Sequence, residues 1–312
     1  MPFRNDLHGF CYYLMCKHGN PSALTEEQKA DEFRKMYVMK SPVKMKDIRA
    51  VAVCCNINVD ALDSMPSNLR GYHDVYNENR TIYYKQGDAV SGIQNTILHE
   101  IREMMELHFV EVCTAYEPLA DSALHIAANR FASAVLLPRE SFTNKVYETG
   151  LDVFELSNYY SKSCSQVLLR MGEVLNGKHF FYGALYERDS ERDAWSLNYC
   201  TLSPSQFPEP NFGELGAFFP TKGSAVTPGS LVDMAISGRK AYLVRILTLL
   251  DGMPKGGKTR EGLVALARPL LTSDVPTRVA LMVVLGRNRN LLDPQVNRII
   301  PEIVKGFHSA LY

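Results

Sequence analysis

The sequence predicts an α+β protein, with helices gathered in the first half of the chain and strands mostly in the second. Residues 2–39, 91–106 and 119–137 carry apolar side chains at helical spacing. A short β-rich section at 69–86 interrupts them, and extended runs dominate from residue 179 onward. We therefore expect helices with a small sheet in the N-terminal half and a mixed α/β domain at the C-terminal end.

The composition is that of an ordinary globular protein with balanced charge. The 34 basic residues match the 34 acidic ones, so no broad basic surface for nucleic acid or anionic membrane is expected. No apolar run approaches the roughly 18 residues of a membrane span, and Arg4, Asp6 and Lys17 interrupt the N-terminal segment, unlike a signal peptide. The seven cysteines show no framework spacing and indicate reduced thiols. We expect a cytoplasmic protein without a membrane partner.

The first elements are helical. Residues 2–39 read as helices, and Thr25 with Gln28 forms the pattern of a capping box, in which each side chain satisfies a backbone N–H of the other. The run 51–59 fits the end of a helix followed by a short strand. These elements begin a first domain that we place at residues 1–138.

A hairpin and a long helix follow. Residues 69–76 and 81–86 are extended runs separated by the turn residues Asn77 to Asn79, which predicts two antiparallel strands. A helix then begins near Ser91. Its apolar stripe comprises Ile93, Ile97, Ile101, Met104 and Met105.

A second strong helix covers residues 119–137 and ends at Pro138. Its alanines are small enough to allow another helix to approach closely; they are Ala127, Ala128, Ala132 and Ala134. We expect the two long helices of this domain to be neighbours.

Residues 139–178 form a helical segment that resembles a helix-turn-helix, with pieces at 152–160 and 165–171 around a polar turn. Its charge does not favour DNA binding, because a DNA-binding surface needs an excess of basic residues. The segment's charges balance, since five basic residues are matched in number by five acidic ones. They are Arg139, Lys145, Lys162, Arg170 and Lys178, and Glu140, Glu148, Asp152, Glu155 and Glu173. Direct DNA binding is therefore not expected, and the segment is interpreted as a helical subdomain.

The C-terminal domain, residues 179–312, is predicted to be mixed α/β. Residues 180–187 and 195–201 are expected strands, 203–229 a Pro- and Gly-rich loop, and 230–237 a helix. Two further strands are expected at 263–271 and 279–285. A terminal helix is expected from Asp293 as cap, with Pro294 at its first position, to Leu311.

The long helix from Ser91 carries the main chemical signal. His99-Glu100 begins a pattern that resembles H-E-x-x-H, in which two histidines four residues apart bind zinc and the glutamate acts as general base. Here the fourth position after His99 is Glu103. Because residues four apart share a helix face, His99 and Glu103 can both point at one ion.

A third ligand is expected from the next helix. His125 lies 26 residues after His99, on the helix whose alanines permit close packing. Two histidines and one carboxylate form an established catalytic zinc set that leaves one position open for water. Glu100 would then remain free to take a proton from that water. Two histidines and a carboxylate also suit Mn²⁺ or Fe²⁺.

The pattern resembles the ImmA/IrrE family of metallopeptidases. That family combines H-E-x-x-H with a later E-x-x-A-N-x-F-A-x-x-L-L-x-P, and this chain has His125-x-x-Ala128-Asn129-x-Phe131-Ala132 followed by Val135, Leu136, Leu137 and Pro138. The family's second histidine is Glu103 here, and its glutamate ligand is His125. The two departures exchange a histidine and a glutamate and leave the ligand set unchanged.

The resemblance covers residues 40–175 well and implies a zincin-like metallopeptidase domain followed by a helix-turn-helix-like segment and a GAF-like domain. It implies a zinc-dependent endopeptidase whose protein substrate is a helix-turn-helix repressor, cleaved in a stress or DNA-damage response. The hairpin at 69–86 offers an edge to which an extended substrate could add as a strand. Two alternatives remain: a non-proteolytic transcriptional regulator, or a ligand sensor that acts through the C-terminal domain.

Other polar residues are weaker candidates near the site. Glu106 and Asp121 could orient ligands, and His73 or Tyr72 could reach a substrate from the hairpin, as could Tyr83. His108 faces away from His99 on an ideal helix, so we expect a structural role for it.

The stretch Gly252 to Thr259 matches the phosphate-loop pattern G-x-x-x-x-G-K-T. A nucleotide site also needs a helix directly after the loop and a later strand ending in an acidic residue, but the chain after Thr259 reads largely as strands and too little of it remains. We interpret this stretch as a turn and expect no nucleotide binding.

Overall fold

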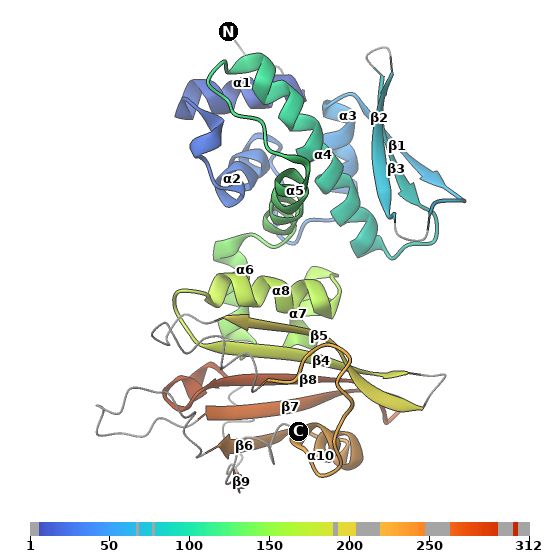
Figure 1. Ribbon diagram of the computed structural model, residues 1–312, viewed down its shortest axis with the longest axis vertical. Coiled ribbons are helices and arrows are strands. Elements are labelled where there is room, and N and C mark those ends of the chain that lie inside the picture. The colour runs from blue at the N-terminus through green and yellow to red at the C-terminus, as the bar shows by residue number, and fades with distance from the viewer. Residues whose placement is uncertain are drawn as a thin grey trace. The chain divides into compact units, whose positions relative to one another are not determined.

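The computed structural model describes most of the chain and divides it into two compact units, Met1–Phe142 and Thr143–Tyr312 (Figure 1). Each unit combines helices with its own sheet, so the predicted α+β class is confirmed. No helix among the described residues is long and apolar enough to cross a membrane. The described residues are 6–66, 69–76, 79–189, 193–203, 219–246 and 263–292, together with the backbone of 302–304.

The first unit begins with four short helical elements, and N-cap side chains accept hydrogen bonds at the starts of three of them. Asp6 accepts a hydrogen bond from the N–H of Gly9 at the start of the first helix. The predicted capping box of Thr25 and Gln28 is confirmed. The elements are α1 (Leu7–His18), η1 (Pro21–Ala23), α2 (Glu26–Met36) and α3 (Met45–Cys54).

A three-stranded sheet follows, made of β1 (Ile57–Leu62), β2 (Gly71–Tyr76) and β3 (Asn79–Lys85) in the order β1-β3-β2. The predicted hairpin is confirmed as the antiparallel pair of β2 and β3, and β1 runs parallel to β3. A side chain at Gly71 would collide with Thr96 of the next helix. Glycine at this position therefore lets the edge strand β2 lie close to that helix.

The two long helices of this unit pack directly against each other. They are α4 (Val90–Val112) and α5 (Asp121–Leu136), and α4 also contacts α1, β2 and β3 (Figure 1). Ala128 and Ala132 are completely buried, as is Phe131 between them. The expectation that small residues on α5 permit a close helix pair agrees with this packing.

The second unit contains a six-stranded sheet in the order β5-β4-β8-β7-β6-β9 (Figure 1). Its neighbouring strands are antiparallel except for β6 and β9, which are parallel. Helix α6 (Arg139–Glu148) leads into it from the first unit's last residues. The other elements are α7 (Val153–Tyr160), α8 (Cys164–Leu175), β4 (Phe181–Asp189), β5 (Ala194–Ser203), α10 (Leu231–Gly238), β6 (Tyr242–Ile246), β7 (Leu263–Thr272), β8 (Val275–Leu285), η2 (Gly286–Leu291) and β9 (Glu302–Val304).

Helices cover both faces of this sheet. Successive side chains of a strand point to opposite faces, and β4 is buried without interruption from Phe181 to Tyr186. Its even-numbered residues belong to the core shared with α10, while Gly183 faces Leu168 of α8. A Cβ at Gly183 would lie 2.7 Å from Leu168 Cδ2, so glycine allows α8 to lie close to the sheet.

This packing determines what α8 can present to a partner. Arg170 is only 2% exposed and donates to Glu173 at 2.8 Å. The α7–α8 pair lies in the same compact unit as the sheet, with α8 packed on β4 and β5.

One predicted element is wrong where it can be compared. The expected terminal helix from Asp293 to Leu311 lies mostly outside the described residues, but Glu302–Val304 is strand β9, paired with β6. The sequence reading also assigned no strand to Tyr242–Ile246, which is β6. The phosphate-loop pattern at 252–259 and most of the predicted loop 203–229 lie outside the described residues.

Candidate metal centre

Two candidate ligands lie one turn apart on α4. His99 and Glu103 share a helix face, and His99 Nε2 lies 3.0 Å from Glu103 Oε1. His99 is buried, whereas Glu103 is partly exposed. The i,i+4 spacing therefore presents an imidazole nitrogen and a carboxylate oxygen to the same point.

The third candidate, His125, comes from α5. Its Nδ1 lies 3.7 Å from Glu103 Oε1, and its ring meets the ring of His99 edge to face with centroids 4.5 Å apart. One donor atom from each of the three residues lies within 4.8 Å of the others. The His125 side chain is 66% exposed, so this side of the group is open to solvent.

These distances fit a tetrahedral divalent ion. Metal–ligand bonds of about 2.0–2.2 Å at tetrahedral angles place donor atoms about 3.3–3.6 Å apart. The separations of 3.0 and 3.7 Å from Glu103 Oε1 lie on either side of that range. Imidazole and carboxylate donors suit zinc, and also Mn²⁺ or Fe²⁺. The open side next to His125 leaves room for a further ligand.

Glu100 lies beside this group and is oriented by the hairpin. Its Oε2 is 2.7 Å from Nδ1 of His73 on β2, and Glu100 itself is buried. His73, Glu100 and Glu103 also present donor atoms within 4.8 Å of one another. Because Glu103 belongs to both groups, Glu100 can act as a free base beside the first group or as a ligand in the second.

Asn129 connects the two histidines, a role that the sequence reading did not assign. Its Oδ1 lies 3.2 Å from His99 Nδ1, and its Nδ2 donates to the backbone carbonyl of His125 at 3.0 Å. An acceptor on Nδ1 favours the tautomer whose Nε2 lone pair faces Glu103. The signal that could have revealed this role was the Asn129 of the second sequence signature, one turn after His125.

The electrostatics of this group favour a charged pair of His99 and Glu103. Burial lowers the pKa of His99, but the hydrogen bond to Glu103 and the charges of Glu103 and Glu100 outweigh it, so the pKa is raised. The hydrogen bond to His99 lowers the pKa of Glu103. A cation that binds here therefore competes with a proton for His99.

The remaining candidates lie away from the three donor atoms. Glu106 is buried and accepts from Arg102, from the Tyr116 hydroxyl and from the backbone N–H of Leu119. Asp121 is exposed at the start of α5, and no hydrogen bond joins it to the His125 ring in the described structure.

The aromatic candidates of the hairpin and the last histidine of α4 are also placed. Tyr72 is exposed on β2, and its ring packs against that of Tyr83, with centroids 5.1 Å apart. His108 is buried at the other end of α4, where its Nδ1 lies 2.9 Å from Glu111.

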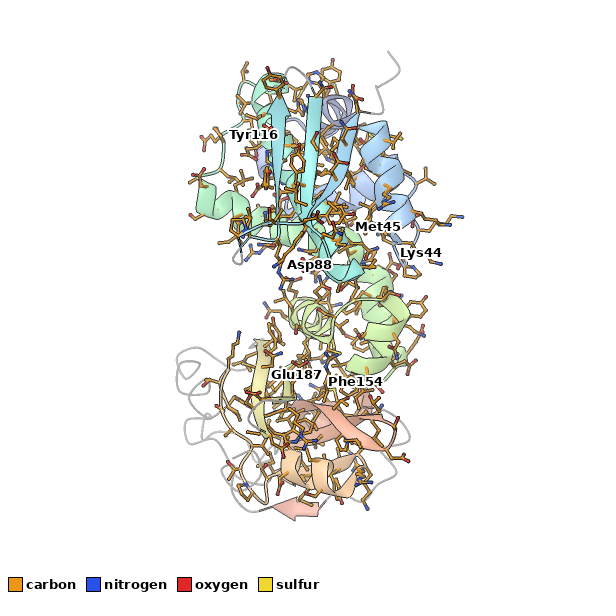
Figure 2. All side chains as sticks on the ribbon, turned by 90° about the vertical axis from the view of Figure 1, so that its right-hand side faces the viewer. Lys44, Met45, Asp88, Tyr116, Phe154 and Glu187 are labelled. Carbon is orange, nitrogen blue, oxygen red and sulfur yellow. The ribbon has the colours of Figure 1, made fainter. Side chains whose placement is uncertain are left out.

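A buried charge network behind the centre was also missed from the sequence. Arg102 is completely buried and donates to both oxygens of Glu26 on α2, at 2.7 and 2.9 Å, and to Glu106 at 2.9 Å. Tyr116, labelled in Figure 2, donates to the same Glu106 oxygen at 2.8 Å. The network ties α4 to α2 and to the segment that leads into α5, and thus supports the helix that carries His125.

Comparisons with known proteins identify the domain that holds this centre. Residues 53–171 match the model of a peptidase family, Peptidase_M78, described as the IrrE N-terminal-like domain. Among solved structures, a chain titled "Mycobacterium tuberculosis transcriptional regulator" matches with a TM-score of 0.56 and 12% identity, over 98% of this chain and 90% of that one. At this identity the likeness concerns the fold alone. No curated protein gives a significant match.

The recognition made from the sequence is confirmed for residues 53–171, which match the IrrE N-terminal-like domain of a peptidase family. The matched residues include His99, Glu100, Glu103 and His125.

Proposed function

We propose that the protein is a zinc-dependent endopeptidase in which His99, Glu103 and His125 hold the ion and Glu100 is the general base. The observation that carries this proposal is the convergence of three donor atoms within 4.8 Å, beside a buried glutamate oriented by His73. This constellation lies in a domain that matches a peptidase family. Exchange of a histidine and a glutamate relative to the family pattern leaves the types of donor unchanged.

The chain's own residues have distinct roles in such a reaction. When bound, zinc supplies Lewis-acid polarisation of the scissile carbonyl and of the attacking water. Glu100 takes a proton from that water and passes it to the leaving amine. His73 holds Oε2 of Glu100 at 2.7 Å and so fixes the orientation of the carboxylate. Asn129 fixes the ring of His99.

The substrate is proposed to bind in extended form along β2. In the described sheet β2 is an edge strand, and it carries His73 together with the exposed Val75 and Tyr76. An edge strand offers unpaired backbone groups that can bind an added strand. The protein substrate that we propose from the family resemblance is a helix-turn-helix repressor, cleaved in a stress or DNA-damage response in the cytoplasm.

The second unit supports a competing proposal. Its six-stranded sheet is covered by helices on both faces, which is compatible with a GAF-like ligand-sensing domain preceded by a helix-turn-helix-like pair. The solved structure that matches nearly the whole chain is titled a transcriptional regulator. In this alternative the protein regulates transcription or senses a ligand without cleaving protein.

One comparison distinguishes the two functions. New protein N-termini are mapped by mass spectrometry in host cells that express either the wild type or Glu100→Gln, before and after DNA damage. We expect new termini inside a helix-turn-helix repressor with the wild type only, because Gln cannot accept the proton. Identical termini with both proteins, together with an intact stress response in Glu100→Gln, would refute proteolysis and support the regulator.

A further inference from the structure

A second group of potential metal ligands lies at the C-terminal end of α4. His108 and Glu111 are three residues apart on this helix, and His8 joins them from the first turn of α1. His108 is nine residues after His99, which places it about 13 Å further along the helix and on the opposite side. This group is therefore separate from the centre formed by His99, Glu103 and His125.

The three side chains converge on one carboxylate oxygen. Glu111 Oε2 lies 2.9 Å from His108 Nδ1 and 3.4 Å from His8 Nδ1. The two rings meet edge to face with centroids 5.5 Å apart, and all three donor atoms lie within 4.8 Å of one another. These separations are close to the roughly 3.3–3.6 Å between donors around a tetrahedral zinc ion.

The helices that carry this group are held firmly together. Leu7 and Cys11, on either side of His8 in α1, are completely buried, and the Cys11 thiol lies 3.8 Å from the backbone carbonyl of Met105 on α4. Asp6 caps the first turn of α1. His8 and Glu111 themselves are exposed, so an ion can reach the group from solvent without opening the core.

The charges around the group are mixed. Glu111 supplies the negative charge that favours a cation, and Arg80 is a nearby positive charge that opposes it.

We propose that His8, His108 and Glu111 form a second divalent-cation site, which links α1 to α4. Two imidazoles and one carboxylate select a first-row transition ion such as Zn²⁺, Co²⁺ or Ni²⁺ over Ca²⁺ or Mg²⁺. Because its ligands come from two helices, the ion cross-links the N-terminal helix to the helix that carries the catalytic candidates. The site does not depend on the proposed peptidase activity.

The test is the zinc stoichiometry of the full-length protein, freed of metal by a chelator, dialysed against zinc chloride alone and analysed by mass spectrometry. His8→Ala and Glu111→Gln change exposed side chains and should leave the fold intact. His18→Ala removes another exposed histidine of α1 and is the matched control. His99→Ala removes the other centre.

We expect two zinc ions per chain in the wild type and in His18→Ala, and one in His8→Ala, Glu111→Gln and His99→Ala. The double variant His8→Ala/His99→Ala should bind none. Equal zinc content in the wild type, His8→Ala and Glu111→Gln would overturn the proposal. If the first centre binds no metal, His99→Ala will match the wild type while His8→Ala still loses one ion, so the two failures can be distinguished.

Discussion

Replacement of Arg102 by methionine should strongly destabilise the first unit. The guanidinium is completely buried and makes three hydrogen bonds of 2.7–2.9 Å to Glu26 and Glu106. Methionine keeps much of the aliphatic volume beside Phe109, but it leaves the buried carboxylate of Glu106 and the partly buried one of Glu26 with only Lys29 close by as a cation among the described residues. Breaking a buried ion pair costs about 3–5 kcal/mol, because the partner keeps an uncompensated charge.

A more exposed ion pair, which also involves a glutamate of α2, provides the control. Glu27, next to Glu26 on α2, pairs with Arg139 at 3.4 Å, and the Arg139 side chain is 47% exposed. An exposed pair contributes about 0.2–1 kcal/mol, because water and salt screen it. Arg139→Met should therefore lower the free energy of unfolding by about 1 kcal/mol or less.

The assay must report on the first unit. The single tryptophan, Trp195, lies in β5 of the second unit, so its fluorescence follows that unit. Amide hydrogen exchange of peptides from α4 and α5, measured by mass spectrometry, gives the opening free energy of the first unit directly. A loss below about 1 kcal/mol in Arg102→Met, or equal losses in the two variants, would refute the argument that burial makes this network costly to break.

Two further predictions concern the supports of the candidate centre. Asn129→Leu should lower zinc affinity about 10- to 100-fold in competition with a chelating dye, because the acceptor on His99 Nδ1 is lost; unchanged affinity would show that Asn129 does not position the ring. The second concerns pH: burial raises the pKa of Glu26, but Arg102 and Lys29 outweigh this and lower it below the ordinary 4.5. The ionised Glu26 therefore stabilises the folded first unit. This contribution to the free energy of unfolding is fully present above pH 4.5 and is lost as the pH falls through the lowered pKa of Glu26. At pH values below 4.5 the opening free energies of α4 peptides should decrease in the wild type, and they should decrease less in Arg102→Met. Parallel pH curves for the two proteins would contradict the assignment of this pH dependence to the pair of Glu26 and Arg102.

Local sequence patterns predicted most of the helices and strands, because the residues that determine each element lie close together in the sequence. The capping box of Thr25 and Gln28 and the period-2 pattern of the hairpin depend on residues within a few positions of one another. The terminal helix was wrong for the same reason: Asp293-Pro294 is a good local start signal, but Glu302–Val304 pairs with the distant strand β6. Such pairing satisfies backbone groups across more than fifty residues and leaves little trace in the local sequence.

The candidate site could be predicted in part. His99 and Glu103 share a face because of helix geometry, and the alanines of α5 indicated that His125 could approach. Arg102 was missed because an arginine on a helix usually faces water, and its partly buried partner Glu26 lies 76 residues away. Glu106 was expected near the centre by its spacing, yet its oxygens bind Arg102, Tyr116 and the Leu119 N–H.

The central claim is that His125 and Glu103 meet at one ion, and metal content tests it most directly. Two full-length variants are compared, Glu111→Gln, which removes the second proposed site, and the double variant His125→Ala/Glu111→Gln. Each is loaded with zinc, passed through a desalting column and analysed for bound metal. We predict one ion per chain in Glu111→Gln and a nearly complete loss in His125→Ala/Glu111→Gln. Undiminished stoichiometric zinc in the double variant would contradict the exchange of ligands between α4 and α5.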